Sequence, residues 1–230
     1  MTNDEIFSKL EGNIELVQEL LAKLQAHGIQ VEFFPDTTSP YSGNGLVTAA
    51  ADWHHHEKVW RVYFPAAGRA HQVYHELLHV QLGCIDRFPI MVPWGNQNAN
   101  NIQELNNDFD HVHVIPAELK AFPEASEYWE GDFDRKFREI SFATVDRLGV
   151  LNRKLSLLRG WLVLPECLQG SEVAGRYREA LRRENWLESA DAMVKAVQHA
   201  GLSKSDAVQA FRKGLGLDFP SAQSIKFSAI

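Results

Sequence analysis

Residues 70–83 read AHQVYHELLHVQLG, and this stretch decides the fold that we expect. Its residues are mostly good helix formers, and Gly83 stands where a helix commonly ends. Leu and Val at helical spacing supply a face that can be buried, so the stretch predicts a half-buried helix. On a helix, residues four positions apart lie one above the other on the same face, which brings His75 and His79 together.

His75, Glu76 and His79 form an H-E-x-x-H motif. Two imidazoles on one helix face can share a metal ion, and Glu76 can reach a water in the coordination position that they leave open. These are the working groups of a zinc hydrolase. The alternative is two His and a Glu on a solvated helix face. The His and Glu frequencies give a chance match odds of about 1 in 30, so we favour a metal site that holds zinc, Zn2+.

The composition is ordinary for a globular protein. The 230 residues are 45% hydrophobic and 23% charged, which suffices for a substantial core. A net charge of -7, with scattered Lys and Arg, argues against a nucleic-acid partner. No apolar run reaches about 18 residues and the N-terminus does not resemble a signal peptide, so we expect no membrane span and a cytoplasmic location. Cys84 and Cys167 do not make a disulfide framework, and nothing indicates the oligomeric state.

The residues before the motif predict one helix and three strands. Apolar residues at helical spacing predict a single amphipathic helix over residues 3–27. Alternation and turn signals then predict strands near residues 29–33, 46–51 and 58–64. We expect the His triplet at 54–56 to lie in a solvated turn, because consecutive side chains on an extended turn do not converge on one point. We also expect His71, one turn before the motif, to lie at the surface.

A second informative stretch follows the motif. Residues 85–101 are rich in Pro, Gly, Asn and Gln and predict a loop. If residues 102–114 are helical, Glu104, Asp108 and His111 share one face, opposite an apolar stripe. Such a stripe is normal for a surface helix. It also lies where a third metal ligand would be expected.

The two stretches together resemble the gluzincin branch of zinc metallopeptidases, and the layout is similar to the small ImmA/IrrE-like group. In gluzincins a Glu on a downstream helix completes the H-E-x-x-H site, and an Asp four residues later often supports a ligand His. Glu104 and Asp108 reproduce that E-x-x-x-D spacing. Metzincins are excluded, because Leu82 and Ile85 stand where their Gly and third His should be. Peptide deformylase is excluded because its Cys ligand precedes the motif, and both Cys here follow it.

The resemblance implies His75, His79 and Glu104 as zinc ligands. The residues alone leave the third ligand open, and three other residues are alternatives to Glu104. They are Asp108, Asp110 and His111, with His111 the strongest because an imidazole is a good zinc ligand. A group that is not a ligand can orient a ligand imidazole or polarise the substrate. Tyr74, His111 and His113 are candidate donors to the oxyanion of the reaction.

The expected activity is that of a zinc-dependent metallopeptidase acting on a peptide or protein substrate, with Glu76 as general base. The gluzincin pattern places the substrate along an exposed edge strand, which we assign to residues 58–64. Two other functions stay open. One is a non-catalytic metal-binding regulator that binds a protein partner. The other is a zinc hydrolase of a non-peptide amide or ester.

The fold class that we expect is α+β, with a small antiparallel or mixed zincin-like sheet packed on the H-E-x-x-H helix and a mostly helical C-terminal half. The metal-binding part would span residues 1–120 and the helical region residues 121–230, unless both form one continuous domain. Helical spacing continues through residues 133–158, where Gly149 is a possible break. Three further helices are predicted, over residues 172–183, 186–199 and 203–214.

Overall fold

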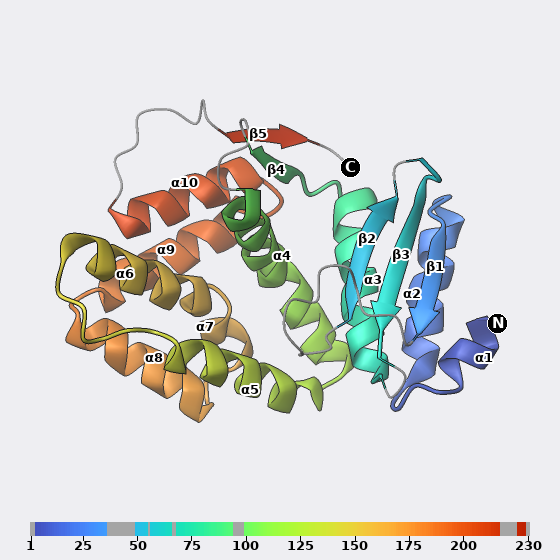
Figure 1. The fold of residues 1–230 in the computed structure, drawn as a ribbon, viewed down its shortest axis with the longest axis horizontal. Helices are drawn as coiled ribbons and strands as arrows, with labels where there is room; N and C mark the ends of the chain where they lie inside the picture. Colours follow the sequence, from blue (N-terminus) through green and yellow to red (C-terminus); the bar gives the residue numbers. More distant parts are fainter. Residues whose placement is uncertain are drawn as a thin grey trace. The chain divides into compact units, whose positions relative to one another are not determined.

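The computed structural model describes residues 3–35, 49–54, 56–65, 68–93, 99–216 and 225–228. The fold is α+β and mostly helical, which confirms the expected class (Figure 1). The chain divides into two compact units. One consists of Met1–Arg87 and Lys120–Pro123, and the other of Phe88–Leu119 and Glu124–Ile230.

The first unit contains a mixed sheet. Its strands are β1 (Val31–Pro35), β2 (Ala50–His54) and β3 (Val59–Phe64). β3 lies in the middle, parallel to β1 and antiparallel to β2. The expectation that residues 58–64 form an edge strand is therefore wrong, and β2 is an outer strand of the described sheet. β3 is hydrogen-bonded on both sides, and its sequence VWRVYF is apolar almost throughout, as is usual for a strand whose two faces are covered.

Two helices replace the single N-terminal helix that periodicity predicts. α1 (Asn3–Phe7) and α2 (Ile14–Ala26) are separated at Gly12, whose φ is 110°. Asn13 caps α2 by accepting a hydrogen bond from the backbone N–H of Glu15 at 3.1 Å. The expectation of one helix over residues 3–27 is wrong because a left-handed glycine and an N-cap interrupt an apolar spacing that otherwise continues.

The predicted motif helix is present as α3 (Ala70–Cys84). It packs against α2, β2 and β3, and α2 and α3 lie behind the strands in Figure 1. The helix contributes fully buried side chains to this packing, among them Val73, Leu77 and Val80. His71 is buried as well, with its ring centroid 6.5 Å from that of Phe122, so the expectation of a surface His71 is wrong.

The second unit begins with a strand that the sequence did not indicate. β4 (Ile90–Pro93) pairs antiparallel with β5 (Ile225–Ser228), and α4 (Ala99–Ala121) follows. The expectation of a loop over residues 85–101 is therefore wrong for residues 90–93, which form β4, and for residues 99–101, which begin α4. Residues 94–98 lie outside the described residues. Asn106 of α4 fixes β4 by accepting from the N–H of Met91 at 2.8 Å and donating to its carbonyl at 2.9 Å. The helix predicted over residues 102–114 is confirmed and is longer than expected.

Helices make up the rest of the second unit. They are α5 (Ala125–Arg138), α6 (Arg147–Trp161), α7 (Leu164–Cys167), α8 (Glu172–Arg183), α9 (Leu187–Ala200) and α10 (Lys204–Leu215). The last three confirm the sequence prediction closely. The run over residues 133–158 divides into α5 and α6, but Gly149 lies inside α6. Asp146 begins α6 by accepting from the N–H of Gly149, and a Cβ on Gly149 would lie 2.1 Å from the Thr144 side chain.

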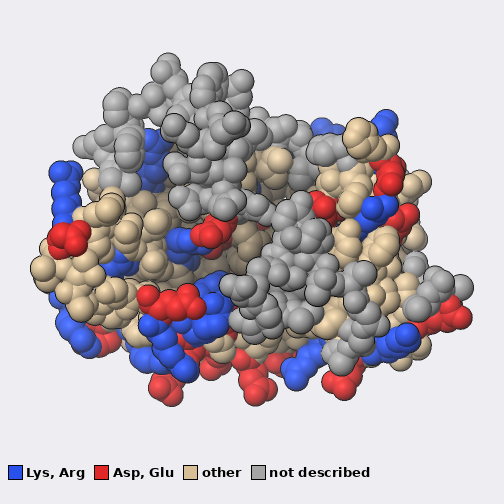
Figure 2. All heavy atoms as spheres, viewed as in Figure 1, with Lys and Arg blue, Asp and Glu red and all other residues tan. Residues whose placement is uncertain are grey.

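Charged side chains of both signs are interspersed over the face drawn in Figure 2, where Lys and Arg lie beside Asp and Glu. Ion pairs one helical turn apart occur in the second unit, such as Arg135 with Asp132 at 2.7 Å. Among the described residues, no helix combines the length and the apolar character needed to cross a membrane.

Candidate metal centre

The structure brings the two motif histidines together, as their spacing predicts. The Nε2 atoms of His75 and His79 lie 3.1 Å apart, and the two rings meet at 73°. Two nitrogens bound to one tetrahedral zinc ion at about 2.0–2.1 Å would be separated by about 3.3 Å. The two imidazoles therefore fit a shared metal ion with little adjustment.

Packing holds the motif helix in this orientation. The residues of α3 that face the first unit's core, Val73, Leu77 and Val80, are inaccessible to solvent. His75 is also buried, whereas His79 is half-buried. Because the apolar face of α3 is fixed against the sheet and α2, the His-bearing face is fixed too.

Glu76 lies between the two histidines in the sequence and reaches the outer strand. Its Oε2 accepts a hydrogen bond from the backbone N–H of Ala51 in β2 at 2.8 Å. This contact restricts the position of the carboxylate that the sequence identifies as a general base. The motif itself cannot reveal the contact, because Ala51 contributes only its backbone and lies 25 residues earlier.

His111 lies on α4 in the second unit and is 8% exposed. The edge of its ring meets Trp129 of α5, with centroids 5.3 Å apart and an angle of 69°. Trp129 in turn donates its indole N–H to the fully buried carboxylate of Glu118 at 2.9 Å. This chain of contacts orients the imidazole from the side of α5. Sequence analysis missed both partners, since nothing in the spacing joins α4 to α5.

Asp110, one of the candidate third ligands, forms a buried ion pair. Its Oδ1 accepts from the Nζ of Lys204 at 2.7 Å, and the Lys204 side chain is inaccessible to solvent. The same ammonium donates to Asn106 at 3.0 Å, next to the contacts that fix β4. The arrangement gives Asp110 a structural role at the start of α10.

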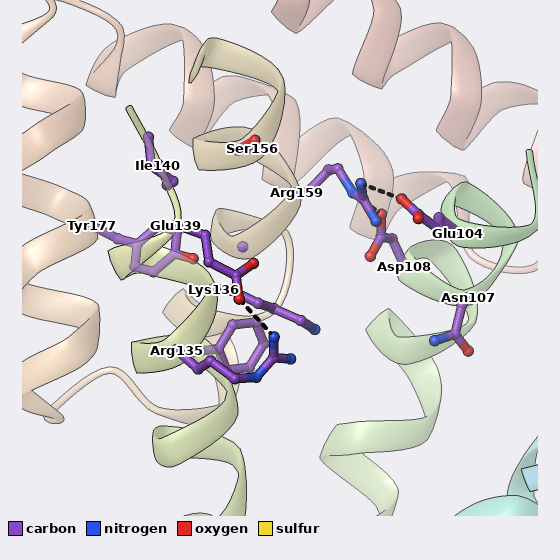
Figure 3. A pocket seen from close by; sticks show the side chains of 12 residues that line it. Glu104, Asn107, Asp108, Arg135, Lys136, Glu139, Ile140, Ser156, Arg159 and Tyr177 are labelled. Atoms are coloured by element: carbon purple, nitrogen blue, oxygen red, sulfur yellow. Dashed lines mark hydrogen bonds and ion pairs between the residues drawn. The ribbon is translucent and has the colours of Figure 1, made fainter. Parts of the chain in front are cut away.

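Glu104 and Asp108 lie together, as the E-x-x-x-D spacing predicts, but they share a guanidinium. Arg159 of α6 donates to Glu104 at 2.9 Å and also to Asp108 (Figure 3). Burial raises the pKa of Asp108, and the attraction of Arg159 opposes that rise. The Glu104 side chain is 57% exposed. An Arg 51 residues later in the chain cannot be linked to Asp108 by local spacing.

The remaining candidate residues have ring contacts within their own units. His113 packs edge-on against Phe88 at 5.0 Å, and burial lowers its pKa. Tyr74 lies 5.2 Å from Phe122, and burial raises its pKa. In the His triplet, His54 ends β2 beside Arg61, and His55 lies outside the described residues.

Comparison with family models, curated proteins and solved structures finds no match for this chain. The resemblance to gluzincins thus stays a prediction that rests on the motif. His75, His79 and His111 form a group of histidines that could hold a metal ion. The donor set suits zinc, because three imidazoles are a common ligand set for that metal.

Proposed function

We propose that the protein is a zinc-dependent peptidase whose metal ion is held by His75, His79 and His111. The observation that carries the proposal is the 3.1 Å separation of two imidazole nitrogens on α3, with a carboxylate at the next residue. Binding of a metal explains why two buried or half-buried imidazoles face each other, and the adjacent Glu76 supplies a group that metal binding alone does not require.

His111 replaces Glu104 as the third ligand in this proposal. Glu104 is exposed and already bound to Arg159, whereas His111 is a buried imidazole. α4 is one continuous helix, and its last two residues belong with Phe122 to the first unit, where Phe122 contacts Tyr74 of α3. The C-terminal end of α4 therefore belongs to the same unit as α3.

Glu76 performs the proton transfers. It would take a proton from the attacking water and return it to the leaving amine of the peptide. The hydrogen bond from Ala51 to Oε2 restricts the carboxylate that performs these transfers. A bound zinc ion would supply Lewis-acid activation of the water and of the scissile carbonyl.

β2 is the strand that we assign to substrate binding, in place of residues 58–64. It is an outer strand of the described sheet, and its Ala51 touches the proposed base. An extended peptide that pairs with an outer strand gains backbone hydrogen bonds with little dependence on its sequence. The proposal therefore predicts broad rather than narrow sequence preference beside the cleaved bond.

A peptide library tests the proposal. The zinc-loaded protein should cleave a subset of peptides, lose that activity on chelation, and regain it when zinc returns. A protein that holds zinc without cleaving any peptide would favour the regulatory alternative. Cleavage of simple esters or non-peptide amides without peptide cleavage would favour the other alternative. Either result contradicts peptidase activity.

A further inference from the structure

A polar cavity of about 490 Å³ lies within the second unit, among α4, α5, α6 and α8 (Figure 3). Such a volume is within the usual range for small-molecule sites. Unlike most of those sites, this one is lined mainly by charged and polar side chains. All its lining residues belong to the second unit, so its shape does not depend on the metal centre.

Tyr177 of α8 is a buried residue that lines this cavity. The residue is only 1% exposed, and among the described residues its hydroxyl forms no hydrogen bond. Burial raises the pKa of Tyr177, so the phenol stays protonated and is a donor at neutral pH. A hydroxyl that faces the cavity without an acceptor on the protein can donate to a molecule that enters the cavity.

Gly160 of α6 makes the approach of this ring possible. A Cβ at Gly160 would lie 2.3 Å from the Tyr177 ring and 2.8 Å from its oxygen. Any larger residue at this position would displace the phenol from the wall. On the other side, the ring is 5.0 Å from that of Phe137, so packing fixes its direction. Gly160 and the Phe137 ring therefore fix the direction of the phenol.

The charges of the cavity are balanced and unevenly placed. Cations and carboxylates are equal in number, the cations being Arg135, Lys136 and Arg159 and the carboxylates Glu104, Asp108 and Glu139. The wall formed by α4 contributes carboxylates and no cation, and the wall formed by α5 contributes Arg135 and Lys136. The acidic wall therefore favours a positively charged group and the basic wall a negatively charged one, although both walls also contain ion pairs.

Donor capacity is left over at the basic wall. Lys136 donates to Asp132 at 2.8 Å, and an ammonium has three N–H groups. Arg159 uses its Nε and Nη1 on the acidic wall, which leaves Nη2. A carboxylate could therefore be bound between Lys136 and the Tyr177 hydroxyl, and an ammonium beside the exposed carboxylate of Glu104.

We infer that this cavity binds a small zwitterion of dipeptide size, with its carboxylate at Lys136 and Tyr177 and its ammonium at Glu104. The site is a binding site without catalytic groups of its own. It requires neither the metal ion nor peptidase activity, so it goes beyond the proposed function and stands or falls independently of it.

Calorimetric titration with L-alanyl-L-alanine tests the inference on the intact chain carrying Glu76→Gln, which prevents hydrolysis of the probe. We expect saturable binding by the dipeptide and much weaker binding by its N-acetylated and C-amidated forms, each of which lacks one charge. Tyr177→Phe removes one hydroxyl and keeps the ring, and we expect it to weaken binding about fivefold. Tyr128→Phe removes a phenol of the same unit that does not line the cavity, and it should bind as the parent does.

Three outcomes would overturn the inference. They are the absence of saturable dipeptide binding, equal binding by the capped forms, and unchanged affinity in the Tyr177→Phe variant. The last outcome would place any bound dipeptide elsewhere, including at the proposed metal centre, since Tyr177 belongs to the helical unit alone. Thermal unfolding of each variant, measured alongside, shows that the comparison is made between folded proteins.

Discussion

The two units carry their chemistry in different ways. In the first unit, five consecutive residues on one helix, His75 to His79, contain two candidate ligands and a candidate base. In the second unit, the polar cavity takes its lining mainly from four helices, and Glu104 and Tyr177 lie far apart in the sequence. The difference teaches that chemistry within one helical turn can be predicted from spacing, whereas chemistry assembled between helices needs the packing.

The largest effect should separate the carboxylates that sequence analysis named in each unit. We expect Glu76→Gln to lower peptide hydrolysis by about a thousandfold, because it removes the proton acceptor. Glu104→Gln should change the rate less than about threefold, because that carboxylate is an exposed partner of Arg159. Initial rates at saturating zinc measure both. An equal loss of hydrolysis rate in the two variants would indicate that Glu104 is part of the metal centre after all.

A buried ion pair holds part of the second unit together. We expect Lys204→Met to lower the free energy of unfolding by about 3 kcal/mol, because Asp110 and Asn106 lose a fully buried ammonium. Lys213→Met, an exposed position on the same helix, should change it by less than about 0.5 kcal/mol. Urea denaturation measures both changes. If Lys204→Met proves as stable as the parent, the pair does not fix α10 to α4.

Two glycines of the helical unit should respond oppositely to alanine. A Cβ at Gly160 would lie 2.3 Å from the Tyr177 ring, so Gly160→Ala should destabilise the fold by about 1–3 kcal/mol. Gly175 has no atom within 4 Å of such a Cβ, and Gly175→Ala should stabilise α8 by about 0.5–1 kcal/mol. Thermal unfolding compares them. The same sign in both variants would contradict the close approach at the cavity wall.

The smallest effect concerns acid stability. Burial raises the pKa of Asp132, but Lys136 and Arg135 outweigh burial and hold the pKa below its usual value. A lowered carboxyl pKa stabilises the folded state above about pH 4, and this stabilisation is lost as the pH falls through the folded pKa.

Asp132→Asn should therefore cost about 0.5–1 kcal/mol at neutral pH and less at about pH 3. Urea denaturation at the two pH values measures the difference, with the exposed Glu172→Gln as control. A cost that is the same at both pH values would show that the effect of Asp132→Asn does not come from its charge.

Local sequence signals predicted part of the fold, and the elements that depend on contacts between distant residues could not be predicted. α3 and the helices α8 to α10 follow from spacing, caps and glycines near their ends. β4 does not, because its partner Ile225–Ser228 lies more than a hundred residues later and its clamp is the side chain of Asn106. The break at Gly12 was missed because apolar spacing continues across it.

The candidate site was predictable to the same extent. The pair His75 and His79 follows from a spacing of four on a helix. The bond between Ala51 and Glu76 does not, because a backbone N–H carries no sequence signal. Spacing could not decide between His111 and Glu104 as the third ligand, because both lie on the same helix face. The ion pair between Glu104 and Arg159 is formed by packing and is visible only in the structure.

The most direct test measures zinc content together with the atoms around the ion. We expect one zinc per chain in the parent and in His113→Ala, with X-ray absorption indicating three imidazole nitrogens, and a large loss of affinity in His111→Ala. His113 is the matched control because it lies on the same helix and packs on Phe88. A parent protein that binds no divalent metal, or one that keeps full zinc affinity in His111→Ala, would contradict the metal centre proposed for this chain.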